Sequence, residues 1–306
     1  MSGADRRDEL RAHLETTRAQ LEATNAKIEA RAGRNLVFAI GSGLIFGAVF
    51  LVSLLLVKQI FALLVAIIVA IALVELAAAF RIAGRRVPRV GVVLGGLVVV
   101  AGAYFWGAEG MLLGLFAGSA LLTAWRLIEG LVPNWETPPR TLIRDVFSGL
   151  FTLVYVAFLA SFTVLLVEAE NGQWWVFALD VIVVSVDVGA YAAGVTLGKH
   201  KMTPRISPNK TWEGFAGAAI VAMAVGTVVA IFALDQPWWV GIILGVVVLF
   251  TATGGDLTES LIKRNLGVKD MSSWIPGHGG FLDRLDSLLP SAVGVYGVAL
   301  VLGAVS

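Results

Sequence analysis

The 306-residue sequence contains no cysteine and only three histidines, His13, His200 and His278. The absence of cysteine excludes disulfide bonds, thiol catalysis and metal sites with cysteine ligands. Three isolated histidines also argue against a multi-histidine zinc site. Charged residues make up only 15% of the chain, whereas 58% of the residues are hydrophobic. Soluble domains are about 45–50% apolar, so the composition predicts a polytopic membrane protein.

Long apolar runs determine the predicted fold. A helix needs about 20 mostly apolar residues to span a hydrocarbon core of roughly 30 Å. Such runs predict nine transmembrane helices, at 35–57, 60–80, 90–107, 111–130, 146–167, 173–197, 214–234, 238–255 and 288–305. The predicted fold class is therefore an all-α polytopic integral membrane protein. No cleavable signal peptide is evident, so we expect the first apolar run to remain as an anchor.

The distribution of basic residues predicts the orientation. If the N-terminus is cytoplasmic, the inside loops hold every lysine and arginine except Lys58. The outside loops 107–110, 168–173 and 235–239 are acidic or neutral. This asymmetry follows the positive-inside rule. We therefore expect the N-terminus in the cytoplasm and the C-terminus outside.

The chain divides into three predicted parts. Residues 1–33 form a charged amphipathic helix with a heptad-like apolar stripe, which suits either a solvated helix beside the membrane or a short coiled coil. Residues 34–140 hold the first four transmembrane helices, and residues 141–306 form a catalytic region with its site at the cytoplasmic face. Glycines in the third and fourth helices and the heptads permit a homodimer through close helix packing.

Three carboxylates lie inside apolar runs. Asp180 and Asp187 are seven residues apart and therefore share a helix face. A carboxylate in hydrocarbon costs at least ~2.5–3.5 kcal/mol, so this face suggests a polar cavity, with an interhelical hydrogen bond or ion pair as the alternative. Asp187 lies toward the cytoplasmic end and is the functional candidate. Glu75 is alone in its run, where a partner such as Arg126 would satisfy it.

The loop at 198–217 is basic and rich in proline, serine and threonine. Ser207 and Pro208 form a good N-cap and N1 pair for the next helix. A helix N-terminus beside Lys210 and Thr211 would hold a phosphate. The pair is not a Walker A loop, because the preceding glycines are missing. An ordinary positive-inside loop is the alternative.

The densest charge lies at 254–290, in a chain that is otherwise mostly apolar. If 254–266 is helical, Asp256, Glu259 and Lys263 share one face, and Gly267 ends the helix. The run 276–280 is a glycine-rich turn that lets the backbone approach a ligand. Carboxylates bind divalent cations, and lysine and arginine bind phosphate. Two short helices could thus bring Asp256 and Asp283 to a shared cation, whereas the alternative is a solvated charged loop.

One pattern in this stretch resembles the signature of phosphatidate cytidylyltransferases, also called CDP-diacylglycerol synthases: S-x-x-K-R-x-x-x-x-K-D-x-x-x-x-x-P-x-H-G-G-x-x-D-R-x-D. It is filled here by Ser260, Lys263, Arg264, Lys269, Asp270, Pro276, His278, Gly279, Gly280, Asp283, Arg284 and Asp286. The segments 187–191, 207–214 and 255–260 also resemble the family. The resemblance covers about residues 140–306, and the earlier helices match only in being hydrophobic.

The resemblance implies that CTP and phosphatidic acid react to give CDP-diacylglycerol and pyrophosphate. The lipid phosphate is itself the nucleophile and is substantially dianionic near neutral pH, because second phosphate pKa values lie near ~6. No general base is then required, and positioning, metal and basic side chains carry the catalysis. The resemblance implies Mg²⁺ as cofactor in a two-metal centre, with a second cation such as K⁺ left open.

The family resemblance also assigns roles to residues. Asp256 and Asp283 would hold Mg²⁺, and Asp286 and Glu259 would support or extend this ligand set. Lys263, Arg264 and Arg284 would bind the CTP phosphates or the departing pyrophosphate, and His278 would either donate to a phosphate oxygen or fix the glycine turn. Asp187 would line the cavity between nucleotide and lipid. The remaining expected substrate-binding residues are Ser207, Lys210, Thr211, Ser260, Lys269, Asp270, Gly279 and Gly280.

Two other functions remain open from the sequence. A CTP-dependent polyprenol or phytol kinase would use similar residues to transfer the γ-phosphate to a lipid alcohol. A lipid transporter would suit intramembrane aspartates and broken helices, although the charges gather on one face of the membrane. We expect membrane lipid but no nucleic acid as partner, and a bacterial plasma-membrane protein whose active site faces the cytoplasm.

Overall fold

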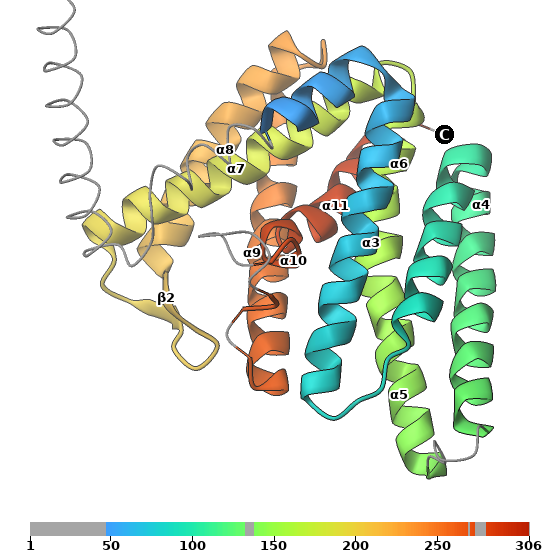
Figure 1. Cartoon of the computed structure of the whole chain (residues 1–306). Coiled ribbons are helices and arrows are strands. Elements are labelled where there is room, and N and C mark those ends of the chain that lie inside the picture. Colours follow the sequence, from blue (N-terminus) through green and yellow to red (C-terminus); the bar gives the residue numbers. More distant parts are fainter. Residues whose placement is uncertain (1–46, 132–137, 269, 273–279, 306) are drawn as a thin grey trace, which may run out of the picture.

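The computed structural model describes residues 47–131, 138–268, 270–272 and 280–305, so the predicted helix at 1–33 lies outside the described residues. The described chain is a helical bundle with one small β-hairpin (Figure 1). After a short apolar helix at Gly47–Leu56, the elements are α3 (Lys58–Ile82), α4 (Arg89–Leu131), α5 (Pro139–Thr152), the π-helix η1 (Leu153–Phe158), α6 (Leu159–Glu168), α7 (Gly172–Leu197), β1 (Lys201–Thr203), β2 (Ser207–Thr211), α8 (Trp212–Phe232), α9 (Trp238–Leu266), α10 (Leu282–Leu285) and α11 (Leu288–Val301).

Seven helical segments among the described residues are long and apolar enough to cross a membrane, and they begin at Lys58, Arg89, Pro139, Gly172, Trp212, Trp238 and Leu282. The predicted class, a helical polytopic membrane protein, is confirmed. The predicted total of nine spans is not, for two reasons. The run at 35–57 lies largely outside the described residues, and the runs at 90–107 and 111–130 occur within the single helix α4.

The helix α4 bends back on itself in its middle. Its 43 residues contain two non-helical positions, Trp106 and Gly107, and Gly107 has a φ of 62° that favours glycine. The two halves then run side by side (Figure 1). A Cβ atom added at Gly95 would lie 2.9 Å from the carbonyl oxygen of Gly118, so only glycine allows this approach. Glycines of the third and fourth predicted helices, which permit a homodimer in the sequence analysis, therefore pack against each other within the chain.

A buried ion pair joins α4 to α5. Arg126 Nη2 lies 2.7 Å from Asp145 Oδ2, and both side chains are almost completely inaccessible to solvent. The second carboxylate oxygen of Asp145 accepts the backbone N–H of Arg86 at 3.0 Å. The suggested pairing of Arg126 with Glu75 is therefore wrong, because Asp145 from the adjacent helix satisfies the guanidinium.

A β-hairpin leads into α8. Strands β1 and β2 pair antiparallel, with Lys201 opposite Thr211 and Thr203 opposite Ser207. The prediction that Ser207 and Pro208 open the next helix is wrong, because both lie in β2. Thr211 is the N-cap instead, and its hydroxyl oxygen accepts the N–H of Gly214 at 3.1 Å.

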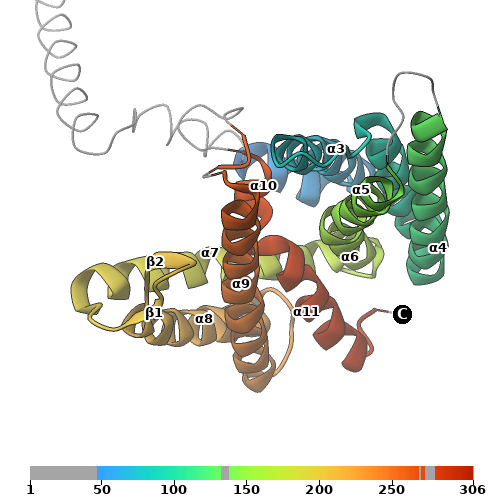
Figure 2. The same cartoon turned by 90° about the horizontal axis from the view of Figure 1, so that it is seen from below.

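The helix α9 lies centrally, between the α7–α8 pair and the remaining helices (Figure 2). It continues without a break through the predicted charged helix and ends at Gly267, whose φ is 71°. Glycine contacts set its close approach to α8, since a Cβ at Gly241 would overlap the backbone at Gly226. The first part of α9 is thereby packed closely against α8.

Candidate active site

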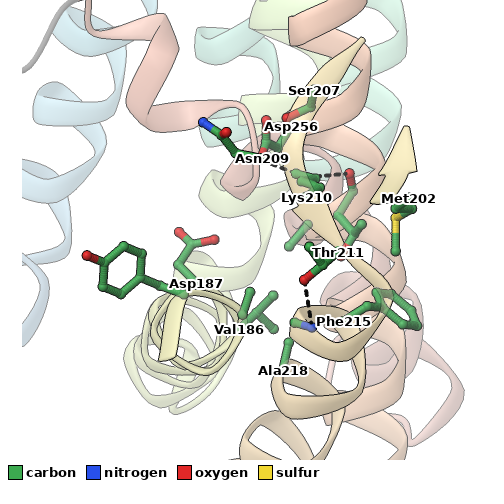
Figure 3. Close-up of a pocket in the computed structure, with 15 residues that line it drawn as sticks. Val186, Asp187, Met202, Ser207, Asn209, Lys210, Thr211, Phe215, Ala218 and Asp256 are labelled. Atoms are coloured by element: carbon green, nitrogen blue, oxygen red, sulfur yellow. Dashed lines mark hydrogen bonds and ion pairs between the residues drawn. The ribbon is translucent and has the colours of Figure 1, made fainter. Parts of the chain in front are cut away.

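A cavity of about 290 Å³ opens between α7, β2, α8 and α9. Asp187 lines it from α7, and Asp256 lines it from α9. Ser207, Lys210 and Thr211 contribute from β2. In Figure 3, Asp187 points toward the cavity from one side, and Lys210 and Asp256 meet on the other. Candidates from three separate sequence segments therefore share one polar cavity.

Lys210 ties the hairpin to α9. Its Nζ atom lies 2.7 Å from Asp256 Oδ2 and also donates to the backbone oxygen of Thr253 at 3.4 Å. The other carboxylate oxygen of Asp256 accepts a hydrogen bond from the Ser260 hydroxyl at 3.3 Å. Both charged side chains keep some exposure, 22% for Lys210 and 36% for Asp256, so a ligand in the cavity can reach them.

A second polar cluster lies further along α9. Lys263 Nζ is 2.8 Å from Asp283 Oδ1 on α10 and 3.2 Å from Glu259 Oε1. Lys263 is seven residues after Asp256, which is about 10 Å along a helix axis. Glu259 lies between them on the same face, as the sequence predicted. The two clusters thus form one charged strip along α9, which carries Asp256, Glu259 and Lys263.

Backbone donors orient Asp283. Its Oδ2 atom accepts the N–H of Gly280 at 2.8 Å and that of Met271 at 3.1 Å. Asp286 follows one turn later, and its carboxylate accepts the N–H of Ser287 at 2.6 Å. The backbone at Asp286 touches α9 at Gly255, where an added Cβ would overlap its carbonyl oxygen. Glycine at 255 therefore brings α10 against the charged face of α9.

The oxygen-rich side chains of this strip suit a hard cation such as Mg²⁺. Glu259 is fully buried, and its carboxylate pairs with Lys263, whose Nζ lies 3.2 Å from Oε1. Lys263 also pairs with Asp283, so one ammonium group serves two carboxylates, and this buried position fits a site that receives further positive charge. Within the described part of the chain, no three acidic or histidine side chains converge as a metal site. A cation shared by Asp256 and Asp283 stays a prediction.

The other predicted residues differ in their placement. Arg264, Asp270 and Arg284 are exposed around the strip, and Ser260 is half-buried beside Asp256. Three predicted residues lie outside the described residues: Lys269, His278 and Gly279. Asp180 does not share the cavity of Asp187; it lines a separate, small apolar cavity with Leu285 and Leu289.

The structure adds polar contacts that the sequence pattern did not indicate. Glu213 on α8 accepts hydrogen bonds from the backbone N–H groups of Lys199 and His200 and pairs with the His200 ring, which closes the base of the hairpin. Glu75 on α3 accepts hydrogen bonds from the backbone just after Gly280 and does not have Arg126 as its partner. Its position in an apolar run signalled a buried partner, but not which one.

Comparisons with known proteins show which family the chain resembles. Residues 38–302 match the model of the cytidylyltransferase family. A phosphatidate cytidylyltransferase of Mycobacterium bovis is 39% identical over 272 residues, which cover 87% of this chain and 89% of the relative. The enzyme of the same name from Mycobacterium leprae is 40% identical over 271 residues, 86% of this chain and 87% of the relative. One from Bacillus subtilis is 44% identical over 124 residues, 39% of this chain and 45% of the relative.

The family match also corrects the expected extent of the resemblance. The signature alone indicated similarity from about residue 140 onward, whereas the family model begins at residue 38. The early helices therefore belong to the family's fold. Their similarity escaped motif recognition because apolar membrane helices carry few distinctive residues.

Proposed function

The chain belongs to the cytidylyltransferase family, and we propose that it transfers the cytidylyl group of CTP to phosphatidic acid, giving CDP-diacylglycerol and pyrophosphate. The curated relatives that cover most of the chain are named phosphatidate cytidylyltransferases. The observation that carries the proposal is the contact of Lys210 with Asp256 in the cavity, because it joins two motifs that resemble those of this family at one polar site.

The reaction needs two anions to meet in line. An oxygen of the lipid phosphate forms a bond to the α-phosphorus of CTP, while the bond from that phosphorus to the bridging oxygen breaks and pyrophosphate leaves with the electron pair. Catalysis of such a transfer rests on positioning and on stabilisation of phosphate charge. Lys210 on one side of Asp256 and Lys263 on the other supply fixed positive charge along α9.

We assign the nucleotide phosphates to the cavity beside β2. Thr211 Oγ1 accepts the N–H of Gly214, which leaves its hydroxyl proton available to a phosphate oxygen. Ser207 and Lys210 line the same cavity. The exposed Arg264 and Arg284 would meet the β- and γ-phosphates or the leaving pyrophosphate. Asp187 would lie between nucleotide and lipid.

Asp256 and Asp283 would hold Mg²⁺, with Glu259 and Asp286 as further oxygen donors. When bound there, Mg²⁺ supplies Lewis-acid stabilisation of phosphate charge. The buried carboxylate of Glu259, which shares the Lys263 ammonium group with Asp283, supports this assignment. A second cation such as K⁺ is compatible with the number of carboxylates.

We further propose nine spans, a cytoplasmic N-terminus, an external C-terminus and an active site at the cytoplasmic face of a bacterial plasma membrane. The bend of α4 supports counting this helix twice, and the helix at Gly47–Leu56 supports a span before α3. The basic residues of the hairpin and of the end of α9 support a cytoplasmic site. A homodimer remains a proposal from the heptads in residues 1–33.

Pyrophosphate release tests the proposal. Purified protein with CTP, phosphatidic acid and Mg²⁺ should release pyrophosphate in equal amount to CDP-diacylglycerol. Asp283→Asn should lower the rate at least about a hundredfold, as losses of transition-state stabilisation do, and EDTA should abolish it. Asp235→Asn is a matched control, because Asp235 is exposed in the opposite loop and its positive φ of 51° suits asparagine equally.

Two results would contradict the proposal. No lipid-dependent pyrophosphate with any phosphatidic acid would exclude cytidylyl transfer. Release of CDP with a polyprenol, together with γ-phosphate in the lipid, would identify a lipid kinase instead.

A further inference from the structure

Glu75 is a buried carboxylate in the apolar helix α3, with only 1% of its surface exposed. It accepts hydrogen bonds from residues far along the chain, between 272 and 282. Oε1 accepts the N–H of Phe281 at 3.0 Å and the hydroxyl of Ser272, and Oε2 accepts the N–H of Leu282 at 2.9 Å. These donors follow Glu75 by about two hundred residues in the chain. Both carboxylate oxygens are therefore engaged by the turn that leads into α10.

The same turn orients Asp283. Gly280 lies between the two carboxylates, because an added Cβ would be 2.9 Å from Glu75 Oε2 and 3.1 Å from Asp283 Oδ2. Asp283 in turn accepts the N–H of Gly280, and also that of Met271, next to Ser272. The segments 271–272 and 280–282 thus donate hydrogen bonds to Glu75 on one side and to Asp283 on the other. A shift of this turn away from α3 would move the donors that hold Asp283 beside Lys263.

The contacts of Glu75 differ from those of its apolar neighbours on α3. Its neighbours Leu73 and Leu76 are fully buried in the apolar core of the bundle. Within the described part of the chain, in contrast, the hydrogen bonds of Glu75 come from Ser272 and from the turn just before Asp283. A carboxylate in an apolar helix is unfavourable unless its partners are well placed. Here the partners are backbone N–H groups and a hydroxyl, all of which donate to the charged form.

We propose that Glu75 is a positioning residue of the active site, which fixes the turn at 280–282 so that the Asp283 carboxylate faces Lys263 on α9. This inference rests on the proposed function for its catalytic consequence, although the anchoring itself does not. It also gives the N-terminal half of the chain a specific part in the site.

Glu75→Gln tests this role, because glutamine keeps the size of the side chain but replaces one acceptor oxygen with a donor. One of the N–H groups at 281 and 282 then faces an NH₂ group. We expect kcat for pyrophosphate release to fall about ten- to a hundredfold, as the loss of a hydrogen bond to a charged group predicts. The KM for CTP should change less than threefold, because the cavity beside Lys210 is untouched. Ser272→Ala should cause a smaller fall in kcat, and the double variant should lose less than the product of the two.

Hydrogen exchange measures the anchoring without any turnover. Peptides covering residues 280–286 should exchange faster in Glu75→Gln, while those covering 211–217 stay as in the wild type. Glu129→Gln is the matched control, since Glu129 is also an acid within an apolar helix but lies on α4, where it accepts a hydrogen bond from Trp125. This control should leave both exchange and kcat unchanged.

Three outcomes would overturn the inference. Unchanged exchange at 280–286 in Glu75→Gln would show that the turn does not depend on this carboxylate. Faster exchange with unchanged kcat would show that the anchoring has no catalytic consequence. A lowered unfolding temperature with wild-type kcat per folded molecule would show a purely structural role. Absence of wild-type activity with phosphatidic acid would instead refute the proposed function, and the exchange result would still decide the anchoring.

Discussion

At the scale of single residues, Lys210 and Lys201 show how similar side chains on one hairpin differ in consequence. Lys210 points to Asp256 in the cavity, whereas Lys201 is exposed on β1. We expect Lys210→Gln to lower kcat/KM for CTP about a hundredfold, because a fixed charge near the phosphates is lost and Asp256 loses its partner. Lys201→Gln should stay within about twofold of the wild type, since exposed charges contribute little. Steady-state kinetics with varied CTP measure both, and equal losses would contradict the assignment of the phosphates to this cavity.

Individual residues were predictable here, but their partners were not. Asp187, Lys210 and Asp256 are recognisable from residue type and local motif. The contact between Lys210 and Asp256 joins a hairpin to a helix more than forty residues later, and no local pattern encodes it. Glu75 illustrates the same limit, because the cost of a carboxylate in hydrocarbon predicts that a partner exists. It does not choose between Arg126 and the backbone of a distant turn.

At the scale of elements, the pair Arg126–Asp145 fixes α4 against α5. Removing one partner of a buried ion pair typically costs about 3–5 kcal/mol, because the other charge is left uncompensated. We therefore expect Arg126→Leu to lower the unfolding midpoint in detergent strongly, and the double change with Asp145→Leu to restore part of the loss. Arg140→Leu is the control, because Arg140 is exposed near the start of α5 and should have little effect. A loss in the double variant equal to the sum of the losses in the two single variants would show that the two charges are not coupled.

Helices were well predicted as elements, whereas their ends and joints were not. The length of the apolar runs alone identified the spans. A segment that crosses a bilayer must form its backbone hydrogen bonds internally, and a helix does so. The chain reverses at Trp106 and Gly107, so the two helices predicted at 90–107 and 111–130 are the two halves of α4, packed side by side. The sequence predicted that α8 begins at Ser207 and Pro208, whereas it begins at Trp212. Thr211 caps the helix, and the residues before it pair as a strand.

At the scale of the whole molecule, the absence of cysteine makes the orientation directly measurable. Single changes Glu109→Cys and Lys201→Cys place a thiol at exposed positions in the α4 bend and on the hairpin. With the cytoplasmic site proposed above, a membrane-impermeant maleimide should label Glu109→Cys on intact cells and Lys201→Cys only after lysis. The reverse pattern would invert the proposed topology, and labelling of both positions on intact cells would refute the alternation of spans between them.

The two lysine–carboxylate pairs along α9 also bear on how the protein can be stored and reactivated. Asp256 and Asp283 each have a cation supplied by the chain itself, in Lys210 and Lys263. Their charge is therefore compensated from within, and we expect folding to be independent of an added ion. Chelated protein should keep its unfolding midpoint and regain full activity once Mg²⁺ is returned, so that the ion acts as a reversible on–off control of a preassembled enzyme rather than as part of its scaffold.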